Sequence, residues 1–159
     1  MKLSFFSLAS GSSGNCYYLG TPDFGILIDA GISFRTIKKV LKDNNIDISK
    51  IAAVLVTHDH ADHIKTVGYL GEKMYLPIYS TADVHRGIDN SRYVEETLNG
   101  SRRIIQKEVP FMIRDFSIVA FEVPHDSTDN VGYHICYKDH KFTFATDVGH
   151  ITDTVKKYM

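Results

Sequence analysis

The stretch Thr57-His58-Asp59-His60-Ala61-Asp62-His63 decides how this chain folds and where its chemistry lies. It follows directly on residues 51–56, an uninterrupted apolar run with the length and β-branched content of a buried strand. Sites in open α/β sheets form at the carboxyl ends of strands, where loops leave the sheet. Four potential metal ligands within six residues at such a position predict a metal site rather than a solvated polar loop.

The spacing inside this stretch indicates two ions rather than one. His58 and His60 are two residues apart, so in an extended turn their side chains are able to converge on a single ion. Asp62 and His63 follow where the chain turns, and they are placed to address a second ion.

Composition predicts one globular domain. The sequence has 159 residues, of which 43% are hydrophobic, and this length is sufficient for a genuine core. The 18 basic and 19 acidic side chains give a net charge of −1, so any binding of polyanions requires a local patch or bound cations. Cys16 and Cys136 are too few for a disulfide framework, which favours a reducing compartment. No stretch approaches the roughly 18 apolar residues of a membrane span.

The N-terminus resembles a secretion signal only superficially. Its apolar part covers residues 3–9, is interrupted by serines and follows a single lysine, Lys2. That is at or below the length of a signal core, so we interpret it as a first strand and expect a cytoplasmic protein.

Apolar runs and turn residues predict the remaining elements. Strands are predicted over residues 3–9, 16–19, 23–28, 51–56, 74–79, 111–113, 116–123, 131–137 and 141–146. Helices are predicted from Ser33, as N-cap, to 44, over 62–71 and 82–88, and from 151 onward. Residues 90–108 show no clear pattern. The basic residues in and around them form either a phosphate-binding rim or a solvated surface, and we favour the second: Arg86, Arg92, Arg102, Arg103 and Lys107.

Two further strand ends carry potential ligands. His125 follows Val123-Pro124, and Asp147 follows the apolar residues 142–146. Each alone is typical of a turn residue, but three ligand-bearing loops that each follow an apolar strand favour one site. Imidazole and carboxylate suit Zn, Mn or Fe, and the absence of a cysteine ligand argues against a structural zinc site.

Two ions in such a site predict hydrolysis. Ions about 3.5–4 Å apart share a bridging water and lower its pKa toward about 7. The bridge requires an anionic oxygen ligand, for which Asp147 is the candidate, while Asp62 ligates the second ion and orients the nucleophile. The same cations neutralise charge on a phosphoryl or acyl oxygen.

The pattern His58-x-His60-x-Asp62-His63, followed by His125 and Asp147, resembles the metallo-β-lactamase superfamily. This resemblance implies an α/β fold of the αββα sandwich type and a hydrolase, because His60 stands where oxygen-reducing diiron relatives carry Glu. It also implies a ligand set: His58, His60 and His125 on the first metal, Asp62 and His63 on the second, and Asp147 as the bridge. Ile28-Asp29-Ala30-Gly31 resembles the aspartate turn that steadies the metal loop, so we expect the Asp29 carboxylate to accept hydrogen bonds from residues 57–63.

Two softer motifs narrow the resemblance. Residues 10–16, Ser-Gly-Ser-Ser-Gly-Asn-Cys, and residues 125–132, His-Asp-Ser-Thr-Asp-Asn-Val-Gly, resemble the WalJ (YycJ)-type bacterial branch, regarded as cytoplasmic DNA exonucleases. The resemblance implies a phosphodiesterase with two divalent ions, Zn or Mn, and DNA as partner. Two alternatives stay open: a small ester, thioester or lactam hydrolase, and an inactive metal-binding fragment that acts as an interaction module.

The resemblance also implies a missing part. The superfamily requires a last histidine for the second metal, and His150, which alone follows Asp147, is in the wrong place. We therefore expect residues 1–159 to be one C-terminally incomplete metallo-β-lactamase-like domain, roughly the first half of the sandwich and the start of the second. Strands such as 51–56, apolar on both sides, would then be left uncovered on one face, and we expect self-association through it.

The other aromatic and imidazole side chains are expected to be structural. We expect His134 to be packed or hydrogen-bonded, and His85 and His140 to lie at the surface. Tyr17, Tyr18 and Tyr133 are placed to stack on nucleic-acid bases, but core packing is the better interpretation.

Overall fold

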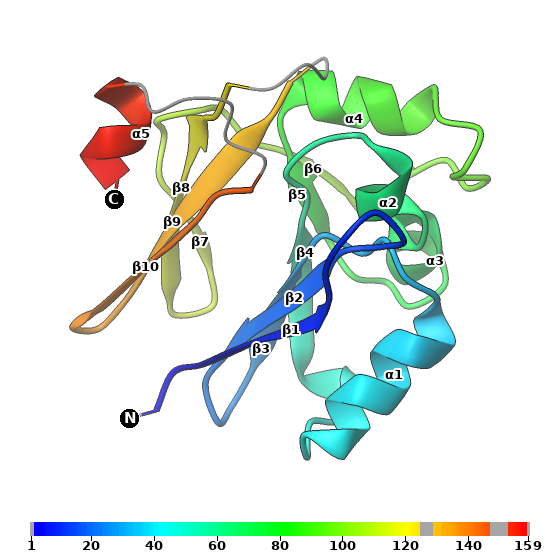
Figure 1. Cartoon of the computed structure of the whole chain (residues 1–159), viewed down its shortest axis with the longest axis horizontal. Helices are drawn as coiled ribbons and strands as arrows, with labels where there is room; N and C mark the ends of the chain where they lie inside the picture. Colours follow the sequence, from blue (N-terminus) through cyan, green and yellow to red (C-terminus); the bar gives the residue numbers. More distant parts are fainter. Residues whose placement is uncertain (1, 125–128, 147–152, 159) are drawn as a thin grey trace.

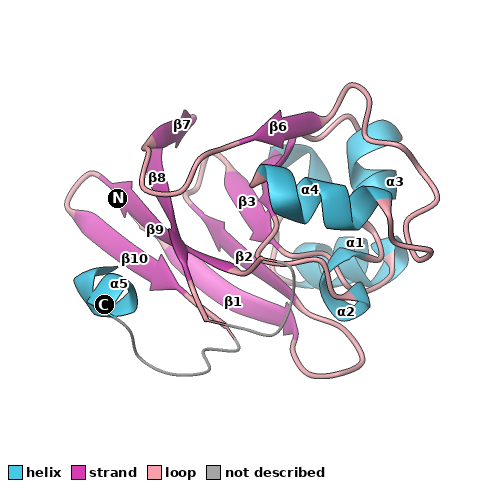
Figure 2. Cartoon of the chain, turned by 90° about the horizontal axis from the view of Figure 1, so that it is seen from above, coloured by secondary structure: helices cyan, strands magenta, loops and turns pink. Residues whose placement is uncertain are grey.

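The computed structural model describes residues 2–124, 129–146 and 153–158, in which two β-sheets lie face to face (Figures 1 and 2). The first sheet has the strand order β1 (Ser4–Ala9), β2 (Cys16–Gly20), β3 (Gly25–Ile28), β4 (Ile51–Leu55), β5 (Ile78–Ser80), β6 (Arg102–Ile104). The second has the order β10 (His140–Phe144), β9 (Val131–Tyr137), β8 (Phe116–Glu122), β7 (Phe111–Ile113). The predicted αββα arrangement is therefore confirmed.

Helices lie on the outer side of each sheet, four of them on the first sheet and the short α5 at one end of the second (Figure 1). Strands β3 to β6 are parallel, and the connections between them carry α1 (Phe34–Asp43), the short 3-10 helix Ile48–Lys50, α2 (Ala61–Ile64), α3 (Val67–Glu72) and α4 (Ala82–Asp89). On the outer face of the antiparallel second sheet lies α5 (Asp153–Tyr158), where the Tyr158 ring stacks on Phe121 with 4.6 Å between centroids.

Helix α1 forms where its local signals predict it. Ser33 is the N-cap, and its hydroxyl accepts a hydrogen bond from the Thr36 backbone N–H at 3.2 Å. Ile37 and Leu41, one turn apart, are fully buried against the first sheet.

Strand β4 is buried on both faces. Val54 packs with the helices on one side, and Ala53 and Leu55 pack with the second sheet on the other, all at 0% exposure. The expectation that this strand would be left uncovered on one face is therefore wrong, because β8 and β9 supply Phe116, Ile118, Tyr133 and Ile135 to the same core. Self-association cannot rest on an uncovered β4 face.

Two predicted elements differ from the structure, and one strand was not predicted. The helix predicted over 62–71 is interrupted at Thr66, because its N–H donates to Ala30 O at 2.9 Å and its hydroxyl to Ile32 O. The strand predicted over 74–79 begins only at Ile78, after Tyr75 with φ 58° and Pro77, which lacks an N–H. Strand β6 lies inside residues 90–108, where no strand was predicted.

His85 is also placed differently from the prediction. It is 1% exposed rather than at the surface, and its Nε2 lies 3.1 Å from Ile78 O and 3.0 Å from Arg103 O. His140 is exposed and His134 Nδ1 lies 2.7 Å from Thr143 Oγ1, as predicted. Tyr18 and Tyr133 are core residues, also as predicted. Both cysteines are free, and no helix within the described ranges is long and apolar enough to cross a membrane.

Candidate metal centre

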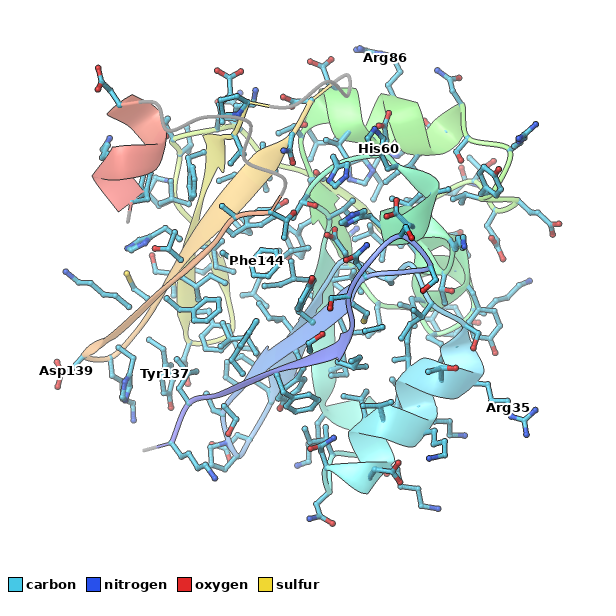
Figure 3. The ribbon with its side chains drawn as sticks, in the orientation of Figure 1. Arg35, His60, Arg86, Tyr137, Asp139 and Phe144 are labelled. Carbon is cyan, nitrogen blue, oxygen red and sulfur yellow. The ribbon has the colours of Figure 1, made fainter. Side chains whose placement is uncertain are left out.

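The predicted ligand stretch begins where β4 ends. Thr57 and His58 are fully buried and His63 is 3% exposed. The His58 ring centroid lies 4.0 Å from that of His63 and 4.7 Å from that of His60, which lies on the α2 and α4 side of the molecule (Figure 3). The three imidazoles of the stretch therefore gather at the carboxyl end of β4.

Asp29, at the end of the neighbouring strand β3, holds this loop. It is 0% exposed, and its φ of 62° turns the chain sharply after β3. Its Oδ1 accepts the Thr57 N–H at 2.8 Å, its Oδ2 accepts the Thr57 hydroxyl at 2.8 Å, and His63 Nδ1 lies 2.7 Å from the same Oδ2. The expected hydrogen bonds between Asp29 and residues 57–63 are confirmed.

Asn15 is a contact of the site that the sequence did not single out. Its Nδ2 donates to Asp62 Oδ2 at 3.1 Å, and its backbone N–H donates to Asp62 O at 2.8 Å. Asp62 Oδ2 also lies 3.7 Å from His63 Nε2. The motif of residues 10–16 indicates the family branch, but a local motif does not indicate that Asn15 bonds to Asp62.

A pocket of about 510 Å³ opens beside these contacts. Its lining includes Asp62 and His63, small polar residues of the β1–β2 turn, and two further side chains: Ser10, Gly11, Ser12, Asn15, Tyr17 and Thr146. The Asp62 carboxylate is therefore accessible from solvent, whereas Asp29 is not.

His125, Asp147 and His150 lie outside the described residues, but described neighbours of the first two reach the same place. Val131 N–H donates to Thr57 O at 2.9 Å. Asn130 Nδ2 lies 3.5 Å from the carbonyl oxygen of Thr146, the residue before Asp147. The end of β4, the start of β9 and the residues directly after β10 therefore lie close together, and the convergence of the ligand loops stays a prediction.

Asp129 is a second contact that the sequence did not single out. It is 9% exposed; its Oδ2 accepts the hydroxyl of Thr81, the N-cap of α4, at 2.7 Å, and its Oδ1 accepts Lys107 Nζ at 2.7 Å. This carboxylate therefore links the residues directly before β9 to α4 and to the segment before β7.

The donor set suits a divalent cation, although the described residues do not form a complete site. Among residues 2–124, 129–146 and 153–158, no group of three His, Cys, Asp or Glu side chains is arranged to hold a metal ion. His58, His60, Asp62 and His63 nevertheless supply imidazole and carboxylate ligands at one strand end, and a buried carboxylate contacts His63 from behind. These residues fit a metal centre.

Two other buried groups nearby are unsuited to acid–base chemistry. Burial, together with the charge of Asp29, raises the pKa of the Cys16 thiol far above neutrality. Burial likewise raises the pKa of Tyr133, whose hydroxyl donates to Val56 O at 2.7 Å. Both side chains stay protonated and serve packing.

The basic residues of the 86–107 region are largely engaged within the chain. Arg86 pairs with Asp83 at 2.7 Å, Arg102 forms two bonds to Asp89, and Lys107 pairs with Asp129. The Arg92 and Arg103 guanidiniums donate to the Tyr93 hydroxyl and to Gly100 O, respectively. These contacts favour the interpretation as structural and surface charges over a phosphate-binding rim.

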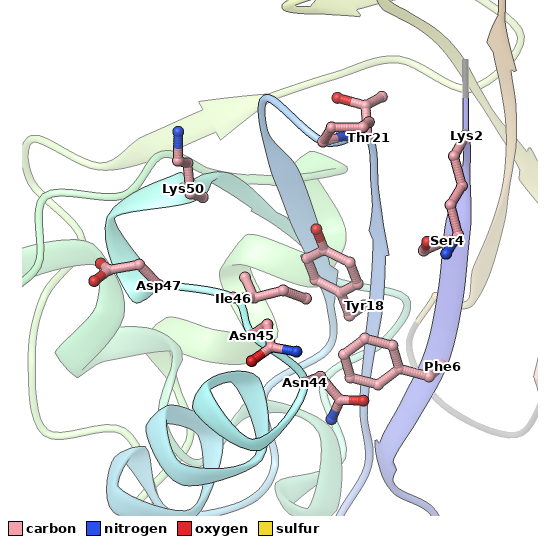
Figure 4. A pocket seen from close by; sticks show the side chains of 11 residues that line it. Lys2, Ser4, Phe6, Tyr18, Thr21, Asn44, Asn45, Ile46, Asp47 and Lys50 are labelled. Atoms are coloured by element: carbon pink, nitrogen blue, oxygen red, sulfur yellow. The ribbon is translucent and has the colours of Figure 1, made fainter.

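A second pocket, of about 460 Å³, lies between β1, β2 and the end of α1 (Figure 4). Phe6 and Tyr18 stack on its floor with 5.0 Å between centroids, and Lys2 and Lys50 stand on its rim. None of the predicted ligands lines it, so it is separate from the candidate metal centre.

Comparison with known proteins gives the relatives of this chain. A family model described as beta-lactamase superfamily domain matches residues 25–159. Exodeoxyribonuclease WalJ of Streptococcus pneumoniae serotype 2 (strain D39) is 34% identical over 146 residues, which are 92% of this chain and 54% of the relative. Exodeoxyribonuclease YycJ of Bacillus anthracis is 31% identical over 156 residues, which are 98% of this chain and 58% of the relative. The chain therefore spans somewhat more than half the length of these curated relatives.

Solved structures show the same fold. Zinc-bound PqqB from Methylobacterium extorquens superposes with a TM-score of 0.74 at 16% identity, over 90% of this chain and 56% of that one. At this identity the likeness concerns the fold alone.

Proposed function

This chain belongs to the β-lactamase superfamily, and from that premise we propose that it is part of a metal-dependent hydrolase that cleaves phosphodiester bonds in DNA. The observation that carries the proposal is the gathering of His58, His60, Asp62 and His63 at the end of β4, with Asp29 bonded behind them. The names of the relatives, both exodeoxyribonucleases, support DNA as substrate.

In this proposal two divalent ions, Zn or Mn, are held by the three ligand loops. His58, His60 and His125 would hold one ion and Asp62 and His63 the other, and Asp147 would supply a further carboxylate to them. When bound, such ions lower the pKa of water and neutralise charge on a phosphoryl oxygen.

The residues of the chain itself provide position and support. Asp29 fixes the loop through Thr57 and His63, and both of its carboxylate oxygens are engaged in these contacts, so it supports the ligands rather than acting as one. Asp62 faces the open pocket, so it is the carboxylate placed to orient an attacking water. The small side chains of Ser10, Gly11 and Ser12 leave room for a substrate backbone beside it.

The runner-up is a small ester, thioester or lactam hydrolase, which would use the same ligands on an acyl carbon. An inactive metal-binding fragment is the remaining alternative for residues 1–159. We place the activity in the cytoplasm because DNA is the proposed substrate.

The experiment uses the full-length protein with Mn²⁺ or Zn²⁺ and end-labelled DNA. We expect degradation from an end and loss of activity in Asp62→Ala, with an unchanged far-UV circular dichroism spectrum. Turnover of a lactam or thioester by the same preparation, without cleavage of DNA, would instead support a small ester, thioester or lactam hydrolase. RNA of the same sequence, assayed in parallel, tests the choice of nucleic acid.

A further inference from the structure

We propose that Thr57 is a positioning residue that determines which nitrogen of His58 carries the hydrogen, so that Nε2 presents its lone pair to the candidate metal centre. The role of this tautomer in metal binding rests on the proposed function, but the tautomer of His58 itself does not. It concerns three groups in contact: the Asp29 carboxylate, the Thr57 hydroxyl and the His58 ring.

The distances define a continuous chain of hydrogen bonds. Thr57 Oγ1 lies 2.8 Å from Asp29 Oδ2 and 2.9 Å from His58 Nδ1. All three residues are 0% exposed, so water does not compete for these groups. Both contacts are of normal hydrogen-bond length.

The donor and acceptor in each of these two hydrogen bonds follow from how many hydrogens each group carries. A carboxylate carries none and accepts only, and a threonine hydroxyl carries one. That hydrogen is required toward Asp29, because otherwise two oxygen lone pairs would face each other at 2.8 Å in a buried site. Toward His58 the Thr57 oxygen therefore accepts, and the hydrogen of the neutral imidazole resides on Nδ1.

The same carboxylate orients the second ring without an intermediary. His63 Nδ1 lies 2.7 Å from Asp29 Oδ2, so its neutral form also carries hydrogen on Nδ1. Metals bind the nitrogen of imidazole that lacks hydrogen, and the bond made by the other nitrogen selects it. Asp29 thus sets His63 directly and His58 through Thr57, and the two rings lie 4.0 Å apart.

The structure also provides a clean variant. The backbone of Thr57 is bonded independently of its side chain, since its N–H donates to Asp29 Oδ1 and its carbonyl accepts from Val131 N–H. Thr57→Val keeps the shape and both backbone bonds but removes the hydroxyl. Thr57→Ser keeps the hydroxyl and is the matched control.

The test is long-range ¹H–¹⁵N NMR of histidine rings in the metal-free 159-residue chain at about pH 8.5, two units above the usual histidine pKa. We expect hydrogen on Nδ1 of His58 in the wild type and in Thr57→Ser, and a shift toward Nε2–H in Thr57→Val. His63 should be unchanged in all three. Hydrogen on Nε2 of His58 in the wild type, or an unchanged tautomer in Thr57→Val, would overturn the inference. If Thr57→Val does not fold, the wild-type tautomer decides alone.

A second measurement connects the tautomer to metal binding. In the full-length protein, calorimetric titration with Zn²⁺ should show an affinity about 10–100-fold weaker in Thr57→Val, and one close to wild type in Thr57→Ser. Equal affinities of all three proteins would count against the role. The NMR measurement requires neither metal nor substrate. Failure of the nuclease assay would therefore refute the proposed function and leave the inference about the His58 tautomer unaffected.

Discussion

Asn15 and Asp62 are 47 residues apart in sequence, yet Asn15 Nδ2 donates to Asp62 Oδ2 at 3.1 Å and fixes a predicted ligand that lines an open pocket. The Asn15 side chain also closes its own turn, since Oδ1 accepts from Gly11 N–H and Nδ2 donates to Gly11 O. The β1–β2 turn and the ligand stretch are therefore one structural unit.

Asn15→Asp should destabilise the chain by about 1 kcal/mol or more, because it replaces a donor to a carboxylate by a second carboxylate oxygen. The contact with Gly11 N–H is preserved, so the loss reports on the bonds that Asn15 Nδ2 donates to Asp62 Oδ2 and to Gly11 O. Urea unfolding near neutral pH measures the change. Asn44→Asp, at an exposed helix end, is the control and should have a smaller effect. Equal midpoints for wild type and Asn15→Asp would contradict this prediction.

Gly31→Ala should destabilise by about 1–3 kcal/mol, the usual cost of overpacking. A Cβ at this position would overlap the backbone oxygen and carbon of Asp62, which cannot move without displacing the loop. Gly100→Ala is the matched control, since nothing lies within 4 Å of its added Cβ, and it should change stability by less than about 0.5 kcal/mol. Thermal unfolding of the two variants side by side decides. Similar losses in both would show that the close approach at Gly31 is not limiting.

The stability of the chain should fall with acidification partly through His85. Burial lowers the pKa of its imidazole below the ordinary 6.5. As the pH falls below about 6.5, His85 is protonated in the unfolded chain but stays neutral in the folded chain. Acidification therefore favours unfolding. Above that pH the neutral ring costs nothing and keeps its contacts with Ile78 O and Arg103 O.

Measured urea midpoints should therefore decline less steeply between neutral and mildly acidic pH in His85→Gln than in the wild type. Glutamine retains a donor at the position of Nε2 without a titratable group. Because other histidines titrate in the same window, only the difference between the two proteins is assigned to His85. Parallel declines would mean that His85 does not contribute.

Self-association stays a prediction, and it now rests on the surface around strands β6 and β7, the edges of their sheets. Ile104, Val109 and Met112 are exposed by 57%, 49% and 61%, and open sheet edges with apolar side chains favour pairing between chains. We expect the 159-residue chain to form dimers at micromolar concentration in analytical ultracentrifugation. Met112→Lys should weaken them. A wild-type chain that sediments as a monomer would contradict the predicted self-association.

The sequence by itself determined the elements with strong local signals. Apolar runs located β1, β2, β4, β7, β8 and β9, and Ser33 located the start of α1. The hydrogen bonds of Asp29 to residues 57–63 were also predicted, from the family resemblance of residues 28–31, whereas the metal-binding role of the stretch stays a prediction. His125 and Asp147, predicted with them, lie outside the described residues.

Only the tertiary structure decided which distant groups meet. Strand β6 carries arginines instead of an apolar pattern. It forms because its backbone pairs in parallel with β5, with Arg102 opposite Ile78. His85 is buried because two carbonyl oxygens from β5 and β6 satisfy its ring, and β4 is covered on both faces because the second sheet folds over it. Asn15 became visible as part of the site, and Asp129 as a link to α4, only through their partners. Hydrogen bonds between residues far apart leave no periodicity in the sequence, and for that reason the supports of the site emerged only from the fold.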